Sequence, residues 1–279
     1  MDDALKPGLY IVATPIGNLS DLSPRAADIL ARADLIAVED SRVTARLLHH
    51  IGAKRQMIPY HDHNADRVRP GLIARMRGAA VALVSDAGTP LISDPGYKLV
   101  RDARAAGIAV TTIPGPSAVI AALTLAGLPT DRFAFFGFLP AKAGAKAAAI
   151  AEAAGFRGTL AFYESGPRLT ATLAALREGL GDRDAAVARE ISKRFEETVT
   201  GTLAGLAERY ADAPPKGEIV IIVAPPGAAE PVSDEQIDEA LRAAMATLSP
   251  SRAAADVAEQ LGLPRRQAYE RAQQLKENK

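Results

Sequence analysis

Short apolar runs alternate along the first 113 residues with longer stretches in which apolar residues recur at helical spacing. The apolar runs are rich in β-branched residues and lie at residues 9–14, 35–38, 56–60, 81–86 and 108–113. Runs of this length and composition predict buried strands, and their alternation with helical patterns is typical of a mostly parallel sheet covered by helices on both faces. The pattern therefore predicts an α/β lobe.

Local signals mark where several helices begin and end. Ser23 can cap a helix whose first position is Pro24, and Gly52 suits the left-handed residue that follows the next helix. Asn64, at the end of the polar stretch YHDHN, can cap a third helix, and an S-x-x-Q capping box begins at Ser233. These signals agree with the helices that the apolar spacing predicts.

The pattern restarts after Gly115. Five further predicted strands lie at residues 132–138, 159–165, 185–190, 195–201 and 218–224. With helical stretches between the earlier of them, they indicate a second α/β unit of similar size. A Pro-, Gly- and Ala-rich linker at 224–234 then leads to a helical tail. We predict an α/β fold with two consecutive lobes, 1–118 and 119–226, and a small helical module at 232–279.

The tail has the pattern of a helical hairpin. Residues 251–275 predict two helices joined around Gly262 and Pro264. The outline is that of a helix-turn-helix, in which Arg265 and Arg266 open the second helix where base-contacting side chains lie. A packed hairpin with two solvated arginines explains the same pattern, and the spacing alone favours this second interpretation.

Composition narrows the class of protein. The chain has 279 residues, 33 basic and 33 acidic side chains and no cysteine. Zero net charge gives no electrostatic indication of nucleic acid, and the lack of cysteine excludes disulfides and thiolate metal sites. The sequence contains no run of 18 apolar residues and does not begin with a signal-peptide pattern. We therefore predict a cytoplasmic protein without membrane association.

Three predicted strands end in loops rich in glycine and proline. The loops lie at 14–19 (TPIGNL), 85–96 (SDAGTPLISDPG) and 113–118 (IPGPSA). Ligands of open α/β sheets bind beyond the carboxyl ends of the strands, where glycine permits close backbone approach and proline fixes loop shape. Three such loops predict a ligand cleft. None matches GxGxxG or GxxxxGK[ST], so neither a dinucleotide nor a nucleoside triphosphate is indicated.

Long motifs over nearly the whole chain resemble one known family. They are LYIVATPIGNLSDLSPRA, VEDSRVTARLL, SDAGTPLISDPG, IPGPSA, FYES and RFEETVTGTL, in this order. The sequence resembles the 16S ribosomal RNA cytidine 2′-O-methyltransferases of the tetrapyrrole methylase superfamily. The resemblance implies two lobes that hold S-adenosylmethionine in a cleft between them, and a homodimer. It also implies that the substrate is a decoding-centre cytidine of 16S rRNA or the small ribosomal subunit.

The resemblance further implies which residues bind the cofactor. The AGTP segment at 87–90 takes the place of the superfamily's Gly-Asp-Pro loop, and Thr89 instead of aspartate argues for the RNA branch. The sequence departs from the family at Gly166 and Pro167, where Pro-His is common, while Arg168 is retained. The implied cofactor-binding residues are Pro15, Gly17, Asp86, Ala87, Gly88, Thr89, Pro90, Gly115, Ser117, Ala118, Tyr163, Glu164, Arg189 and Glu190.

Polar residues at two strand ends are candidates for activating the acceptor. A ribose hydroxyl is a weak nucleophile, so a nearby base or hydrogen-bond acceptor would assist methyl transfer. Glu39 and Asp40 end one predicted strand and YHDHN follows the next, and we take Asp40, His61 and Asp62 as catalytic candidates. His61 and His63 flank Asp62 but have no third, distant ligand in the sequence, so we expect no metal site.

Several basic residues are candidates for binding RNA. Arg42 could hold a phosphate bidentately, although it could equally pair with Asp40. The other candidates are Lys142, Lys193, Arg265 and Arg266.

Two other functions fit parts of the sequence. One is a non-enzymatic DNA-binding regulator that senses a small molecule with its α/β part and reads DNA with the tail. Zero net charge and a single hairpin count against it. The other is methylation of a small molecule, as in the corrin enzymes of the superfamily.

Overall fold

The computed structural model describes residues 4–213, 215–227, 233–261 and 263–277. Contacts within the chain divide it into two compact units, Met1–Pro225 and Pro226–Lys279. The first unit contains two five-stranded sheets, and the described residues of the second form three helices. Among the described residues, no helix is long and apolar enough to cross a membrane.

The first lobe is a parallel sheet with strand order β3-β2-β4-β1-β5. In chain order its elements are β1 (Gly8–Val12), η1 (Leu19–Asp21), α1 (Pro24–Arg32), β2 (Leu35–Val38), α2 (Ser41–His50), β3 (Met57–Pro59), α3 (Ala65–Met76), β4 (Ala80–Val84), α4 (Tyr97–Ala105) and β5 (Val110–Ile113). All five residues of the central strand β4 are buried. This confirms the predicted parallel α/β lobe.

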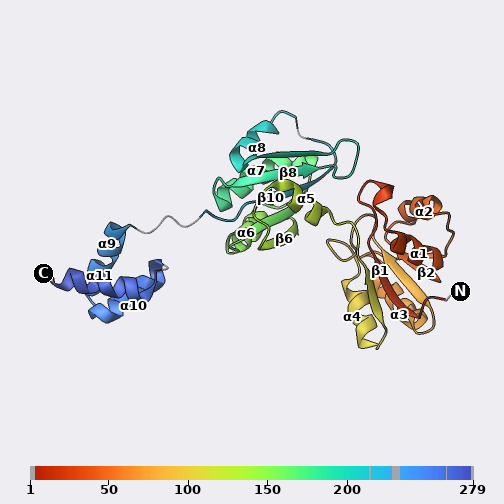
Figure 1. Ribbon diagram of the computed structural model, residues 1–279, viewed down its shortest axis with the longest axis horizontal. Helices are drawn as coiled ribbons and strands as arrows, with labels where there is room; N and C mark the ends of the chain where they lie inside the picture. Colours follow the sequence, from red (N-terminus) through yellow and green to blue (C-terminus); the bar gives the residue numbers. More distant parts are fainter. Residues whose placement is uncertain (1–3, 214, 228–232, 262, 278–279) are drawn as a thin grey trace. The chain divides into compact units, whose positions relative to one another are not determined.

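Helices cover both faces of this sheet because alternate residues of each strand point to opposite sides. Ile29 and Leu47, from α1 and α2, pack in one core, and Leu72 and Leu99, from α3 and α4, pack in another. Figure 1 shows these helix pairs on opposite sides of the sheet. Because the strands are parallel, their carboxyl ends lie at one edge of the sheet.

The second lobe is a mixed sheet with strand order β6-β7-β10-β8-β9. Its elements are α5 (Ala118–Ala126), β6 (Phe133–Phe138), α6 (Ala143–Ala154), β7 (Thr159–Ser165), η2 (Gly166–Arg168), α7 (Leu169–Leu180), β8 (Asp184–Arg189), β9 (Glu197–Thr202), α8 (Leu203–Arg209) and β10 (Glu218–Val223). β6 and β7 are parallel, whereas β10 runs antiparallel to both β7 and β8. The short connection between β8 and β9 allows only an antiparallel pair.

The predicted helix caps and helix ends are present in the structure, with one exception. The Ser23 hydroxyl accepts a hydrogen bond from the Ala26 N–H, and Gly52 has φ +67°. Asn64 lies at the start of α3, but its side chain does not cap that helix. It accepts instead from the His61 N–H and donates to the Pro59 carbonyl, so the predicted cap is wrong. The amide stabilises the preceding turn in preference to the helix.

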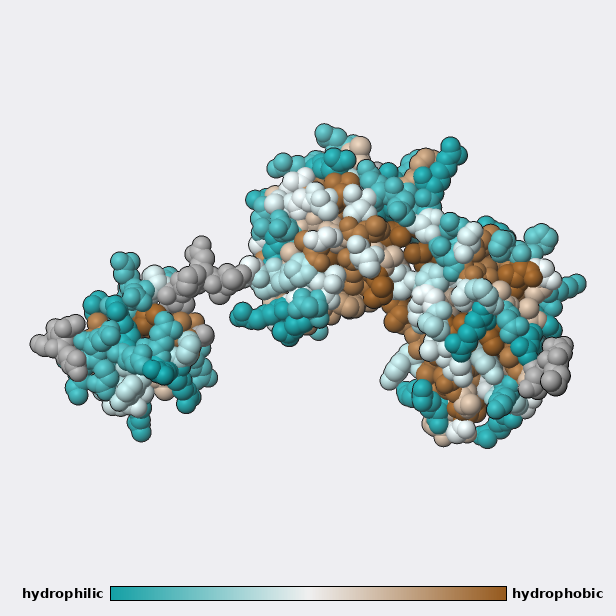
Figure 2. Space-filling model, in the orientation of Figure 1, coloured by the Kyte–Doolittle hydropathy of each residue, from teal (hydrophilic) through white to brown (hydrophobic). Residues whose placement is uncertain are grey.

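The second compact unit is formed by α9 (Asp234–Met245), α10 (Pro250–Leu261) and α11 (Arg265–Glu277). Its core is small and rich in alanine, with Ile237, Leu241 and Val257 as the larger members. The capping box at Ser233 is present, and Gly262 lies outside the described residues. Hydrophilic residues cover most of the face of this unit that Figure 2 shows.

Candidate active site

The three glycine- and proline-rich loops are joined by hydrogen bonds at the carboxyl edge of the first sheet. Thr14 and Gly88 exchange both backbone hydrogen bonds, at 2.9 and 3.0 Å. The Thr89 hydroxyl donates to the Pro116 carbonyl at 3.0 Å. The loops after β1, β4 and β5 are thus one connected surface, as their shared position at the strand ends predicts.

The loop after β4 holds an unusual backbone. Leu91 and Ser93 have φ of 76° and 64°, a region that side chains with a Cβ disfavour. Gly88 and Gly96 are also at positive φ, where glycine carries no penalty. Strained non-glycine residues cost about 1–3 kcal/mol each and cluster at ligand sites. The loop is therefore held in shape by its surroundings.

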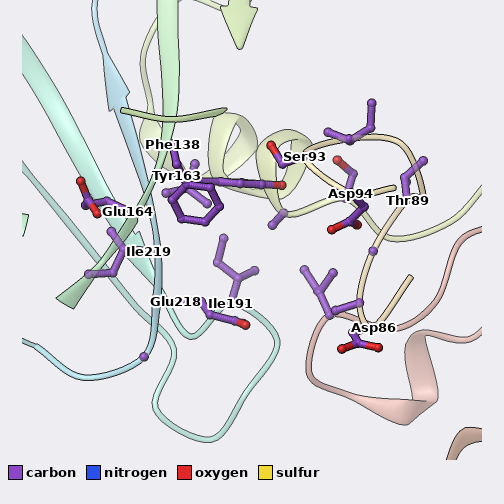
Figure 3. Close-up of a pocket in the computed structure, with 18 of the residues that line it drawn as sticks. Asp86, Thr89, Ser93, Asp94, Phe138, Tyr163, Glu164, Ile191, Glu218 and Ile219 are labelled. Carbon is purple, nitrogen blue, oxygen red and sulfur yellow. The ribbon is translucent and has the colours of Figure 1, made fainter. Parts of the chain in front are cut away.

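A cavity of about 350 Å³ opens between this loop and the second lobe. Its lining comes from both lobes: Ile16, Glu39, Asp86, Ala87, Gly88, Thr89, Ile92, Ser93, Asp94, Ser117, Ala118, Phe138, Tyr163, Glu164, Ser165, Glu190, Ile191, Lys193, Gly217, Glu218, Ile219 and Val220. Figure 3 shows Asp86 and Asp94 on loops of the first lobe, facing Phe138 and Tyr163 on strands of the second. The volume lies in the range of small-molecule sites.

The wall from the first lobe carries three carboxyl groups, Glu39, Asp86 and Asp94. Burial raises the pKa of Asp94 to about 6, and the charges of Glu39 and Asp86 add to this effect. Burial is also the main cause that raises the pKa of Glu39 and of Asp86. None of the three forms an ion pair among the described residues. The wall thus concentrates three carboxyl groups that form no ion pair in the described part of the chain, although the charge of Arg42 acts on Asp86.

The opposite wall is aromatic. Tyr163 packs against Phe135 and Phe138, with ring centroids 4.7 and 5.4 Å apart. Burial and the nearby charge of Asp94 raise the pKa of Tyr163 to about 12, so its hydroxyl stays protonated. In Figure 3 this hydroxyl points toward Ser93 and Asp94. The wall offers a flat apolar surface together with one hydrogen-bonding group.

Charges on the second-lobe side are paired. The Lys193 ammonium lies 3.1 Å from a Glu190 carboxylate oxygen and 2.9 Å from one of Glu218. Burial is the largest single influence and would raise the pKa of Glu190. The hydrogen bonds with Lys193 and with the Glu218 N–H, together with the charges of Lys193 and Arg189, outweigh burial and lower it. Glu190 and Ser192 have φ of 49° and 67°, so this loop is strained like the one across the cavity.

Glu164 is buried and its carboxylate is fully occupied. It accepts from the Thr172 hydroxyl at 2.7 Å and from the Ser165 N–H at 2.8 Å, and Arg168 lies 3.3 Å away. Gly166 leaves no space for a Cβ, because that atom would overlap the Pro215 carbonyl oxygen. At this position the chain therefore accommodates glycine only. The Glu164 side chain therefore holds the local structure.

The structure brings together nine of the predicted cofactor residues. Asp86, Ala87, Gly88, Thr89, Ser117, Ala118, Tyr163, Glu164 and Glu190 line the cavity. The others, Pro15, Gly17, Pro90, Gly115 and Arg189, are not among the lining residues. Arg189 pairs with Glu197 at 2.7 Å, Gly115 packs on Ala13, and a Cβ on Gly17 would overlap the Lys193 side chain. Their binding roles stay predictions.

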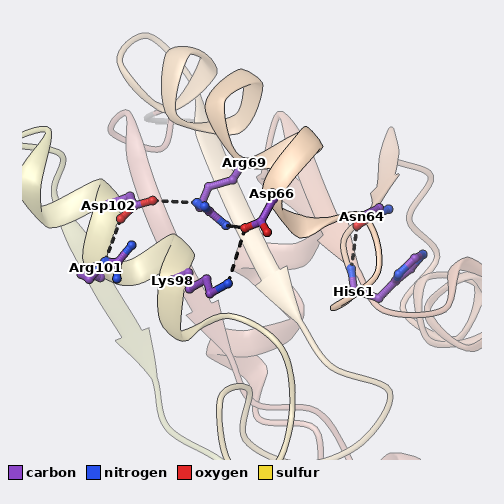
Figure 4. Close-up of polar contacts among 7 residues, drawn as sticks. All are labelled: His61, Asn64, Asp66, Arg69, Lys98, Arg101 and Asp102. Carbon is purple, nitrogen blue, oxygen red and sulfur yellow. Dashed lines mark hydrogen bonds and ion pairs between the residues drawn. The ribbon is translucent and has the colours of Figure 1, made fainter.

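The predicted catalytic residues lie beside the cavity, outside its lining. Asp40 accepts from the Arg42 N–H at the start of α2 and pairs with the Arg42 guanidinium, which lowers its pKa to about 2. His61 and Asp62 are close enough to Glu39 to influence its pKa. The His61 Nδ1 is buried and has no hydrogen-bond partner. In Figure 4 His61 lies apart from the ion-paired network of α3 and α4.

The predicted RNA-binding residues are scattered. Arg42 is 84% exposed despite its pairing with Asp40. Lys142 is exposed at the start of α6, and Arg265 and Arg266 are exposed on α11, where Arg266 pairs with Glu270. Lys193 alone lines the cavity. No group of three or more metal-ligating side chains occurs in the described part of the chain.

Sequence analysis missed several lining residues. Asp94 and Ser93 lie in the loop at 85–96, and only the position of this loop after β4 indicated that they could line the cavity. Phe138 ends β6 and remains 57% exposed, which its apolar strand does not predict. Glu218 begins β10, whose antiparallel direction had to be known before its position could be inferred.

Comparison with known proteins identifies the family. The description Tetrapyrrole (Corrin/Porphyrin) Methylases matches residues 8–207, and RsmI C-terminal HTH domain matches residues 231–276. Ribosomal RNA small subunit methyltransferase I of Erythrobacter litoralis is 52% identical over 98% of this chain and 97% of its own length. The chain belongs to the ribosomal RNA small subunit methyltransferase I family. The protein of that name in Mesorhizobium japonicum is 49% identical, over 98% and 94% of the two chains.

A member of this family is an S-adenosylmethionine-dependent methyltransferase, so the predicted enzyme class and cofactor are confirmed. The two-lobed fold is confirmed as well. Uroporphyrin-III C-methyl transferase from Thermus thermophilus, a structure complexed with S-adenyl homocysteine, superposes with a TM-score of 0.54. The match covers 78% of this chain and 97% of that one at 21% identity. Family membership also removes the non-enzymatic regulator as an alternative.

The cavity residues fit this cofactor. S-adenosylmethionine carries a positive sulfonium and an ammonium group, and the first-lobe wall presents Glu39, Asp86 and Asp94. An opposite charge stabilises these carboxylates in their ionised form. Phe138 and Tyr163 supply an apolar surface of the kind that a purine ring requires. The donor set and the size of the cavity are therefore consistent with the bound cofactor.

Proposed function

We propose that the protein methylates the 2′-hydroxyl of a cytidine in the decoding centre of 16S ribosomal RNA. The observation that carries the proposal is a cavity lined by both lobes, in a chain that belongs throughout its length to the ribosomal RNA small subunit methyltransferase I family. The same family membership argues against a corrin-type small molecule as acceptor. Bound S-adenosylmethionine supplies an electrophilic methyl group.

The chain's own residues have two tasks, binding the cofactor and receiving the acceptor. Gly88 and Ala87 allow close backbone approach on one side, while Phe138 and Tyr163 cover the other. We infer that this arrangement excludes water and fixes the line along which the methyl group moves. Positioning of this kind supplies much of the acceleration of a displacement reaction.

Two sets of groups are candidates for accepting the proton of the acceptor hydroxyl. Asp40, His61 and Asp62 form the set that the sequence predicts, at the rim of the cavity. Glu39 and Asp94 form a second set inside it. We favour the second set, because the Asp40 carboxylate already accepts three hydrogen bonds from the Arg42 side chain. Asp94, with a pKa of about 6, is ionised at neutral pH and is a stronger base.

The basic residues outside the cavity would hold the RNA backbone. Arg42 is exposed beside Glu39 and can bind a phosphate. Arg265 and Arg266 begin the second helix of a helical pair that matches an HTH domain description. We propose that the tail contributes to binding of RNA or the small subunit, so a chain ending at Pro225 should keep cofactor affinity and lose methylation. Arg265→Glu with Arg266→Glu should do the same, because reversed charge repels phosphate.

The decisive experiment is mass spectrometry of 16S rRNA from a strain that lacks the gene. The proposal predicts loss of one 2′-O-methylcytidine, restored by the wild-type gene but not by a Gly88→Leu variant. Purified protein incubated with small subunits from the deletion strain should restore the same modification. An unchanged modification pattern in the deletion strain would refute the proposed substrate.

We also propose that the protein is a cytoplasmic homodimer. Exposed apolar side chains on α5, Ile120 and Leu125, support a protein contact on that helix. Light scattering of the purified chain measures the oligomeric state, and Ile120→Glu with Leu125→Glu should yield monomers if α5 forms the interface.

A further inference from the structure

The loop between β8 and β9 displays an aromatic ring that packs against no core. Phe195 is 66% exposed, although phenylalanine is among the residues most often found inside proteins. The Arg194 guanidinium carbon lies 5.6 Å from the centre of this ring. The two side chains form an exposed aromatic–cation pair, and both neighbours of the pair, Lys193 and Glu196, are charged or solvent-facing.

The loop that carries this pair is rigidly held. Glu190 and Ser192 have positive φ. The Ser192 N–H donates to Glu196 at 2.6 Å, and the Ser192 hydroxyl donates to Asp21 of the first lobe. Lys193 is anchored to Glu190 and Glu218. A fixed loop presents the ring without the entropy loss that ordering a mobile loop would require.

The pair lies next to the cavity along the chain. Glu190, Ile191 and Lys193 line the cavity, and Phe195 follows Lys193 by two residues, which span at most about 7 Å. A nucleotide whose ribose enters the cavity therefore places its chain neighbours within reach of the ring.

We infer that Arg194 and Phe195 form a stacking platform for a base of single-stranded RNA that flanks the methylated nucleotide. This inference rests on the proposed RNA substrate. An exposed ring stacks on any base, and a guanidinium beside it can bind the adjoining phosphate. The chemistry favours RNA over a protein partner, because one ring surrounded by charged residues offers too little apolar area for a protein interface.

The absence of tryptophan from this chain makes a direct test available. Phe195→Trp introduces the only indole, and a base stacked on it should quench its fluorescence. The probe is a short single-stranded RNA with the decoding-centre sequence, added to full-length protein with S-adenosylhomocysteine. Phe133→Trp is the matched control, because Phe133 is also exposed (41%) but begins β6, at the end opposite Phe138. Quenching in the control alone, or in neither variant, would overturn the inference.

Kinetics then separate stacking from other contacts. Phe195→Ala should raise KM for the small subunit about 5- to 100-fold, the scale of one lost base–aromatic stack, with kcat and S-adenosylhomocysteine affinity unchanged. Phe195→Tyr should retain most activity, whereas Phe195→Leu, which is apolar but not flat, should behave like Phe195→Ala. Wild-type KM for Phe195→Leu would indicate an apolar protein contact and reject stacking.

Failure of this inference differs from failure of the proposed function. If wild-type protein methylates small subunits and Phe195→Ala does so with the same KM, only the platform is rejected. If wild-type protein does not methylate 16S rRNA at all, the substrate is rejected, whatever the fluorescence shows.

Discussion

The two walls of the cavity differ in whether their carboxyl groups are paired with a cation. On the first lobe Glu39, Asp86 and Asp94 form no ion pair with any residue that the structure describes, and burial raises the pKa of each. On the second lobe Glu190 and Glu218 are bonded to Lys193, and Glu164 is enclosed by hydrogen bonds. The first arrangement leaves partly desolvated carboxyl groups that are offset by hydrogen bonds, such as the one that the Asp40 N–H donates to Asp86, whereas the second pairs its charges with a cation.

This difference indicates where ligands act. A wall with unpaired carboxylates can bind a cationic ligand or accept a proton. A wall whose charges are already paired contributes mainly the shape of the site. Strained backbone is found in both walls, at Ser93 and at Glu190. The walls therefore resemble each other in backbone conformation and differ in the pairing of their carboxyl groups. Five predictions test or sharpen this contrast.

The largest effect is expected from Gly88→Leu. Gly88 has φ +77°, and a Cβ there would already lie 3.4 Å from Ile16, so a leucine strains the loop and enters the cavity. We expect S-adenosylmethionine affinity to fall at least about 100-fold by calorimetry, since a filled site loses several contacts at once. Gly107→Leu is the control, because Gly107 has a similar φ of +69° with nothing within 4 Å. Equal losses in both variants would show that backbone strain alone is responsible.

Asp94→Asn should lower single-turnover methylation about 100-fold, the usual scale for lost acid–base assistance. In wild type the rate should fall as the pH drops below the pKa of Asp94, because protonated Asp94 cannot accept a proton. This pKa is about 6 without ligand and is lowered by the positive charge of the bound cofactor. This dependence should be absent in the variant. Cofactor affinity measured separately distinguishes a base from a binding group, which would lose affinity instead.

Asp40→Ser is the matched comparison for Asp94→Asn. Serine can cap α2 as Asp40 does, so the fold is preserved while the carboxylate is removed. A large loss of rate in Asp40→Ser with normal kinetics in Asp94→Asn would place the base at the rim and contradict our preference for the inner set.

A smaller effect is expected from Lys193→Met on the paired wall. The substitution retains the apolar stem but leaves Glu190 and Glu218 without their cation. We expect a loss of about 1–2 kcal/mol in the free energy of unfolding, because Glu190 is mostly buried and Glu218 is exposed. Urea denaturation measures it. Glu218→Gln, which removes only the exposed partner, should change stability much less.

The last prediction concerns the pH dependence of stability at Asp94. Its pKa is raised above the unfolded value of 3.8 to about 6, so the folded state binds more protons between these values. Stability from this group is present below pH 3.8 and is lost as the pH rises through 6. Asp94→Asn should therefore raise the melting temperature at pH 7.5 and have no such effect near pH 4. A lower melting temperature at pH 7.5 would show that Asp94 is paired after all.

Sequence reasoning located the strands and the three loops because apolar runs and Gly/Pro clusters are local signals. It placed Gly88, Thr89 and Tyr163 at the site through motifs that resemble a family. It did not find the role of Lys193, which pairs with Glu190 after β8 and with Glu218 at the start of β10, or the exposure of Phe138. Such facts depend on which segments meet across the cavity. The prediction that Asn64 caps α3 was wrong for a related reason, because its side-chain amide bonds instead to two backbone groups of the preceding turn.

The hydrogen bond between Ser192 and Asp21 joins residues 171 positions apart, and the Thr14–Gly88 bridge closes a shorter loop of the same kind. Contacts of such separation form slowly, because a long stretch of chain must be ordered before they contribute. During synthesis the sheet of the first lobe can form before the residues of the second lobe, which form the other wall of the cavity, have been added to the chain. The binding site is thus among the last parts of the enzyme to form, and retention of the cofactor reports that both lobes have finished folding.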